Sequence, residues 1–215
     1  MVLLQAAEAE VASLNLMDMA MKGGWIMIPL LLLCIMAIYI FIERLIVIRK
    51  ASYKDPSFMN KIKDYINEGK IDAALTLCKN TDTPYSRMVE KGIERLGRPM
   101  NDVLVAVENV GNIEVGKLER GLSLLATTAG GGPMIGFLGT VIGMIQAFFN
   151  MANAGNNVDV TSLADGIYTA MVTTVAGLIV GIIAFFAYNY LTSKVDTVVN
   201  NMEARTLEFM DILNE

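Results

Sequence analysis

Three stretches of the 215-residue chain contain no Asp, Glu, Lys or Arg, and their lengths limit what the chain can fold into. The first, residues 24–42, ends at Glu43. The other two are residues 121–158 and 166–193. A helix of about 20 apolar residues crosses a hydrocarbon core of roughly 30 Å. The sequence therefore predicts an all-α membrane protein with three transmembrane helices.

The composition indicates that membrane and aqueous segments alternate. Hydrophobic residues make up 54% of the chain and the mean hydropathy is +0.49, which is too apolar for an ordinary soluble domain. A signal peptide is the alternative for the first span, but residues 1–21 contain no Lys or Arg. We expect a periplasmic amphipathic leader at 1–22, transmembrane helices at 23–43, 121–152 and 166–193, a cytoplasmic helical segment at 44–120, a periplasmic loop at 153–165 and a cytoplasmic C-terminal helix at 194–215.

The distribution of basic residues predicts the orientation. Apart from Lys22, every Lys and Arg lies in residues 44–120 or 194–205. Basic residues near span ends stay on the cytoplasmic side of the membrane. The N-terminus is therefore expected in the periplasm and the C-terminus in the cytoplasm.

Composition also argues against several classes of function. The net charge is −5 and no basic stripe is present, so nucleic-acid binding is not expected. The chain has no histidine, and Cys34 and Cys78 have no ligand spacing. We therefore expect no metal, no cofactor and no enzymatic activity.

Proline and glycine divide the segment after the first span into short helices. The expected helices are residues 58–69 after an Asp55-Pro56 cap, 70–79, 85–97 after Thr83-Pro84, and a fourth from Pro99 that has no breaker until Gly130 and so continues into the second span. Residues 130–133 (GGGP) are interpreted as a flexible junction at the span entrance. Glu108 and Glu114 are interpreted as part of a solvated face.

The second and third spans each place small and hydroxylated residues on one helical face. The second has Gly132, Gly136, Thr140, Gly143 and Ala147, and the third has Gly166, Ala170, Thr173, Thr174, Gly177 and Gly181. One interpretation is close helix packing through Gly136, Gly143, Gly177 and Gly181. The other is a polar ion path lined by Thr140, Thr169, Thr173 and Thr174, because hydroxyls both donate and accept hydrogen bonds. Spacing alone leaves both open.

Four segments resemble one known family. They are "IERLIVIRKA" after the first span, "TPYSRMVEKGIERL", "AGGGPMIGFLGTVIGMIQAF" and "GIYTAMVTTVAGLIVGIIAFFAYN". The third is similar to the "GLLGTVxGxxxxF" signature of the ExbB/TolQ/MotA proton-channel family. The order and spacing match from about residue 25 to 201, and three spans suit the ExbB and TolQ branch.

The resemblance implies a homopentamer in the lipid of the bacterial inner membrane. It would enclose two copies of a single-span partner, similar to ExbD or TolR, that carries a membrane Asp. Proton flow would then energise outer-membrane transport through a TonB-like protein. Matched by motif, Thr140 and Thr174 are the pore threonines. A TolQ-like envelope role, a gliding or secretion motor, and a scaffold that conducts no ions are the alternatives.

One position departs from the family pattern. Where the span-three motif usually has Glu, this chain has Thr169. The spans then supply no carboxylate, and the protonatable group is expected on the partner. Hydroxyl and carbonyl oxygens also suit a hard cation, so Na⁺ stays open as the coupling ion.

Overall fold

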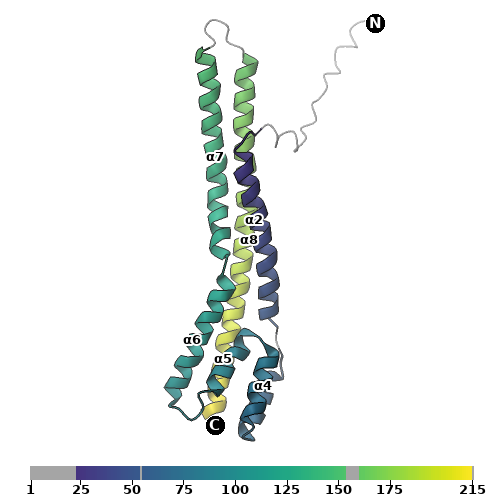
Figure 1. Cartoon of the computed structure of the whole chain (residues 1–215), viewed down its shortest axis with the longest axis vertical. Coiled ribbons are helices and arrows are strands. Elements are labelled where there is room, and N and C mark those ends of the chain that lie inside the picture. The colour runs from purple at the N-terminus through teal and green to yellow at the C-terminus, as the bar shows by residue number, and fades with distance from the viewer. Residues whose placement is uncertain (1–22, 54, 154–159, 215) are drawn as a thin grey trace, which may run out of the picture. The chain divides into compact units, whose positions relative to one another are not determined.

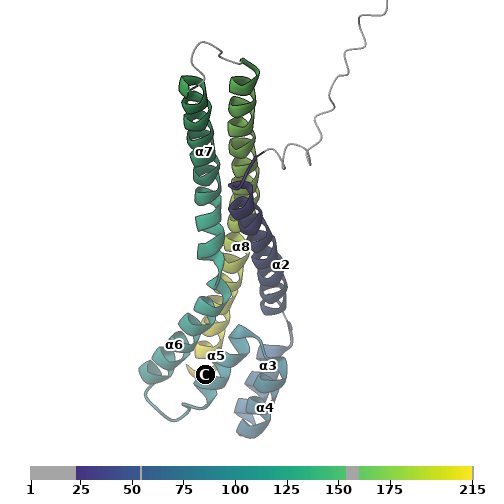
Figure 2. The ribbon, with the colours of Figure 1, turned by 45° about the horizontal axis from the view of Figure 1, so that its top comes forward.

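The computed structural model describes residues 23–53, 55–153 and 160–214, in which every regular element is a helix (Figures 1 and 2). The helices are α2 (Met27–Ala51), α3 (Phe58–Asn67), α4 (Ile71–Thr81), α5 (Pro84–Ile93), α6 (Met100–Glu119), α7 (Leu122–Asn153) and α8 (Val160–Asn214). Three described stretches are long and apolar enough to cross a membrane, which confirms the predicted fold class. The leader at 1–22 and loop residues 154–159 lie outside the described residues.

The chain forms two compact units, and the first contains the start of α2 with residues 127–153 of α7 and 160–185 of α8. The two long helices run side by side in both views (Figures 1 and 2). Small residues such as Ala170 and Ala184 are fully buried between helices. Large apolar side chains point outward instead, including Phe137, Phe149 and Ile182 at 54–66% exposure. This reversal of the usual burial pattern is what helices surrounded by lipid require.

The second unit contains residues 37–126 and 186–214 and has a conventional apolar core. Phe58, Ile62 and Phe209 are fully buried in it. The ring of Phe58 packs edge-on against that of Tyr85, with centroids 5.1 Å apart. The amphipathic α3 and α5 thus bury their apolar faces within this unit.

Two helix starts in the second unit show how accurate the predicted boundaries were. Thr83 caps α5: its hydroxyl accepts from the Ser86 amide at 3.4 Å, and the Ser86 hydroxyl accepts from the Thr83 amide at 3.0 Å. This reciprocal arrangement confirms the expected start at Thr83-Pro84. The expected cap at Asp55 was wrong. Asp55 instead accepts from both the amide and the hydroxyl of Ser57, at 2.9 and 2.8 Å, and α3 begins at Phe58.

The predicted continuous helix from Pro99 into the second span was also wrong. α6 ends at Glu119, and α7 starts at Leu122 (Figure 1). Between them Arg120 has an extended ψ of 127° and Gly121 has φ +85°. By contrast, residues 130–133 are not a flexible junction, because α7 is helical throughout them, with Pro133 inside the helix.

Glu114 does not face solvent as expected. It is 4% exposed, and its carboxylate pairs with Arg87 at 2.5 Å and with Lys117 at 2.6 Å. Arg87 also binds Asp82, and this hydrogen bond is the main reason why the pKa of Asp82 lies below its usual value. Glu108 is exposed, as predicted. The two cations, Arg87 and Lys117, offset the free-energy cost of burying the charged carboxylate of Glu114.

Candidate ion path between α7 and α8

Glycine allows α7 and α8 to approach until their backbones touch. A Cβ atom on Gly136 would lie 2.8 Å from the carbonyl oxygen of Thr173, and one on Gly177 would lie 2.6 Å from that of Gly132. A Cβ on Gly143 would lie 2.9 Å from the Cβ of Ala170. Real Cβ contacts of this length are essentially never seen. We call this contact line the α7–α8 interface.

Three threonine hydroxyls meet at the centre of this interface, and we call Thr140, Thr173 and Thr174 the threonine cluster. The hydroxyls of Thr140 and Thr174 are hydrogen-bonded to each other across the two helices. The Thr140 hydroxyl oxygen also lies 3.0 Å from the carbonyl oxygen of Ala170. The Thr174 hydroxyl oxygen lies 3.2 Å from the carbonyl oxygen of Gly136, and each hydroxyl can donate its one hydrogen to only one of these acceptors at a time. The hydroxyls therefore lie close together only because the glycines bring the helices into contact.

The third member of the cluster is the most enclosed. Thr173 is 2% exposed, and its hydroxyl lies 2.7 Å from the carbonyl oxygen of Ala170 and 3.3 Å from that of Gly136. Thr140 and Thr174 are half-buried. Five oxygen atoms, three hydroxyl and two carbonyl, thus converge in an apolar surrounding. Each hydroxyl can exchange a donated hydrogen bond for an accepted one, so the group can pass on a proton or coordinate a cation.

Thr169 does not join the cluster. It is half-buried, and no hydrogen bond connects its hydroxyl to the other three within the described residues. Around α8, Thr169 lies about 140° from Thr174 but only about 40° from Thr173, which is one turn further along. Of the four threonines predicted to line one path, three therefore meet, and Thr169 lies one turn before Thr173 with no hydrogen bond to them among the described residues.

The predicted packing glycines all lie on the α7–α8 interface. Besides the contacts of Gly136, Gly143 and Gly177, a Cβ on Gly181 would lie 2.6 Å from the ring of Pro133. One residue was missed: Gly139 lies directly against the Thr173 hydroxyl. A signal for it was present, because Gly139 lies three residues after Gly136 and four before Gly143.

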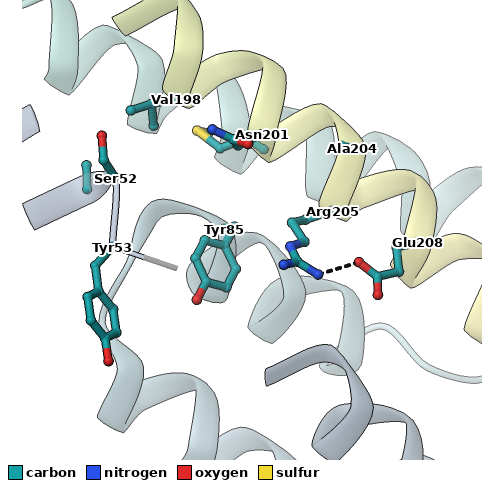
Figure 3. A pocket seen from close by; sticks show the side chains of 10 residues that line it. Ser52, Tyr53, Tyr85, Val198, Asn201, Ala204, Arg205 and Glu208 are labelled. Carbon is teal, nitrogen blue, oxygen red and sulfur yellow. Dashed lines mark hydrogen bonds and ion pairs between the residues drawn. The ribbon is translucent and has the colours of Figure 1, made fainter. Parts of the chain in front are cut away.

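The second unit has a separate pocket of about 220 Å³, and none of the four threonines predicted to line an ion path lies in it (Figure 3). Tyr85, Arg205 and Glu208 line it, with Arg205 and Glu208 paired at 2.6 Å. Among the described residues, Tyr85 is one of two with a buried side-chain polar atom that has no hydrogen-bond partner. No group of three or more acidic, cysteine or histidine side chains that could hold a metal ion occurs in the described part of the chain.

Comparison with known proteins places the sequence among the MotA, TolQ and ExbB proteins. The sequence model of the MotA/TolQ/ExbB proton channel family matches residues 80–204, which include the threonine cluster. An ExbB homolog for biopolymer transport from Methanothermobacter thermautotrophicus is 29% identical over 190 residues, covering 88% of this chain and 67% of that protein. The biopolymer transport protein ExbB of Neisseria meningitidis is 24% identical, covering 86% and 92%. The Tol-Pal system protein TolQ of Haemophilus influenzae is 35% identical over 103 residues, covering 48% and 45%.

Proposed function

Since this chain belongs to the MotA/TolQ/ExbB proton channel family, we propose that its threonine cluster forms part of an ion path in an ExbB-like motor subunit. The observation that carries this proposal is the convergence of Thr140, Thr173 and Thr174 on two carbonyl oxygens. Burying hydroxyl and carbonyl groups in an apolar surrounding is costly unless they are hydrogen-bonded. The family is one of channels, so no enzymatic reaction is proposed.

The titrating group is proposed to lie on a partner chain. Residues 121–158 and 166–193 contain no carboxylate, and Thr169 occupies the position of the family's usual Glu. An isolated charge at the membrane centre costs about 2.5–3.5 kcal/mol on insertion scales. An Asp on a single-span, ExbD-like partner would be stabilised beside the hydroxyls of the threonine cluster.

A further part of the proposal concerns the assembly and its orientation in the membrane. We propose a homopentamer in the inner membrane around this partner, with residues 44–120 and 194–215 in the cytoplasm and residues 153–165 in the periplasm. The concentration of Lys and Arg in residues 44–120 and 194–205 supports that orientation. Motion coupled to ion flow would then energise a TonB-like protein.

The experiment replaces the hydroxyls without changing shape. Thr140→Val and Thr174→Val together remove two hydroxyls and keep two branched side chains of the same size. Ion flux is measured in proteoliposomes that contain the chain and its partner, under an H⁺ gradient and, separately, a Na⁺ gradient. We expect flux to fall at least tenfold while the complex still co-purifies. Thr127→Val is the matched control, because Thr127 is exposed on the same helix.

Equal flux in the double variant and the control would refute the ion path. The gradient that drives flux in the wild-type chain identifies the ion, H⁺ or Na⁺. The five-oxygen geometry is compatible with both, since hydroxyls relay protons and neutral oxygens coordinate a hard cation.

A non-conducting scaffold is the second candidate, and the backbone contacts of Gly136 and Gly177 favour it. In that case the valine pair would leave partner function intact, whereas Gly136→Leu or Gly177→Leu would abolish assembly. A TolQ-like envelope motor is the third, given the similarity to a Tol-Pal system protein. Co-purification of a TonB-like protein, or its absence, separates the ExbB-like role from the TolQ-like one.

A further inference from the structure

The joint between α6 and α7 consists of Arg120 and Gly121 alone. Arg120 has φ −55° and ψ 127°, and Gly121 has φ +85°. A Cβ on Gly121 would meet only the side chain of Ile40, at an ordinary 3.4 Å. The left-handed backbone, and not lack of space, is therefore what requires glycine at this position.

Arg44 binds the end of α6 at this joint. It is a charged residue only 8% exposed, and its Nη1 donates to the carbonyl oxygen of Lys117 at 2.9 Å. Its other guanidinium nitrogens bind Glu43, so the charge is paired. In an unbroken α-helix the Lys117 carbonyl would instead accept from the amide of Gly121, four residues on. Arg44 thus takes an acceptor that the break leaves open.

The same lysine is held through its side chain as well. Lys117 Nζ binds the buried carboxylate of Glu114 at 2.6 Å, and Glu114 binds Arg87 at 2.5 Å. The last turn of α6 is therefore fixed to α5 on one side and to α2 on the other. Its carbonyl is presented to Arg44 at a defined position, as the capping of a helix end requires.

We propose that the joint at Arg120 and Gly121 is a two-state hinge, and that Arg44 is a positioning residue that holds it bent. In the bent state Arg44 binds the Lys117 carbonyl. In the straight state the Gly121 amide takes that carbonyl, and α6 continues into the first turn of α7. The two states exchange one donor for another on the same oxygen, so neither leaves it unsatisfied. This inference does not depend on the ion path proposed above.

Amide hydrogen exchange measured by mass spectrometry on the full chain in lipid nanodiscs tests the hinge. The first amides of a helix have no partner within it, so those of Gly121 and Leu122 exchange readily in the bent state. Gly121→Ala disfavours the left-handed backbone, and Arg44→Met removes the competing donor. We expect both to slow exchange at Gly121 and Leu122 by about tenfold or more, as local opening becomes rarer.

Matched controls isolate the joint. Gly116→Ala changes an exposed glycine of α6 with nothing within 4 Å, and Arg49→Met changes an exposed arginine of α2. Both should leave exchange at Gly121 and Leu122 unchanged. Gly121→Asn should also keep the wild-type pattern, because asparagine tolerates the left-handed region.

Three results would overturn the proposal. Faster exchange at the joint in Arg44→Met would mean that Arg44 only holds α2 and α6 together. Unchanged exchange in both test variants would mean that no straight state is accessible. Raised exchange along the whole chain in Gly121→Ala, with Gly121→Asn folded normally, would mean that the bend is obligatory.

Discussion

Replacing Gly136 with alanine should force the α7–α8 interface apart. The added Cβ would lie 2.8 Å from the Thr173 carbonyl oxygen, 3.0 Å from the Gly177 Cα and 3.2 Å from the Thr174 Cα, all of them backbone atoms. Non-bonded carbon and oxygen approach to roughly 3.3 Å, so the helices must part locally by about half an ångström. Overpacking of this kind costs about 1–3 kcal/mol.

The higher helix propensity of alanine stabilises the Gly136→Ala variant and partly hides the cost of overpacking. A control variant that has the same gain in propensity is therefore needed. Alanine favours a helix over glycine by about 1 kcal/mol wherever it is placed in the interior. Gly130→Ala, on the same helix with nothing within 4 Å, carries this gain alone. The free energies of unfolding of the two variants should therefore differ by about 1–3 kcal/mol, with Gly136→Ala the less stable.

Reversible unfolding in mixed detergent micelles, followed by helical circular dichroism, measures this difference. The hydroxyls of Thr173 and Thr174 lie 3.3 and 3.2 Å from the Gly136 carbonyl oxygen, so the same opening would break both hydrogen bonds. Ion flux should therefore fall in Gly136→Ala and not in Gly130→Ala. If the free energies of unfolding of the two variants differ by less than about 0.5 kcal/mol, a Cβ on Gly136 does not overpack the α7–α8 interface, and the reasoning is refuted.

Three further outcomes are expected in the second unit. Thr83→Ala should lower the free energy of unfolding by about 1 kcal/mol through loss of the α5 cap, with exposed Thr76→Ala as the control; equal effects would contradict the capping role. Burial raises the pKa of Cys78 to about 12, so a maleimide at pH 8 should leave it unmodified until the chain unfolds, and rapid labelling of the folded chain would contradict this. Arg87→Met should cost about 1–3 kcal/mol, because Glu114 loses one of its two partners, and rescue by Glu114→Gln would show that this pair is the cause.

The sequence was most informative where a pattern reports on the surroundings of a whole helix. Stretches without charge located the three spans, because a charged side chain is expensive in lipid regardless of its neighbours. Spacing of three and four residues placed the glycines on the α7–α8 interface.

The errors arose where a distant residue decides the local structure. A single glycine such as Gly121 is a weak breaker within a helical pattern. Here the helix break at Gly121 is accompanied by a hydrogen bond from Arg44 to the carbonyl oxygen of Lys117. These two residues are 73 positions apart in the chain. The burial of Glu114 likewise depends on Arg87, which lies on another helix. Neither pairing leaves a trace in the local sequence.

The uncharged α7–α8 interface also determines how the membrane voltage can act on this protein. Moving one elementary charge across 100 mV is worth about 2.3 kcal/mol, and a neutral group gains nothing. Residues 127–153 of α7 and 166–185 of α8 contain no Asp, Glu, Lys or Arg. The field therefore does no direct work on the side chains of these segments when they move. If an ion moves along these segments, the charge that couples them to the membrane voltage is that of the ion and not one of their own side chains.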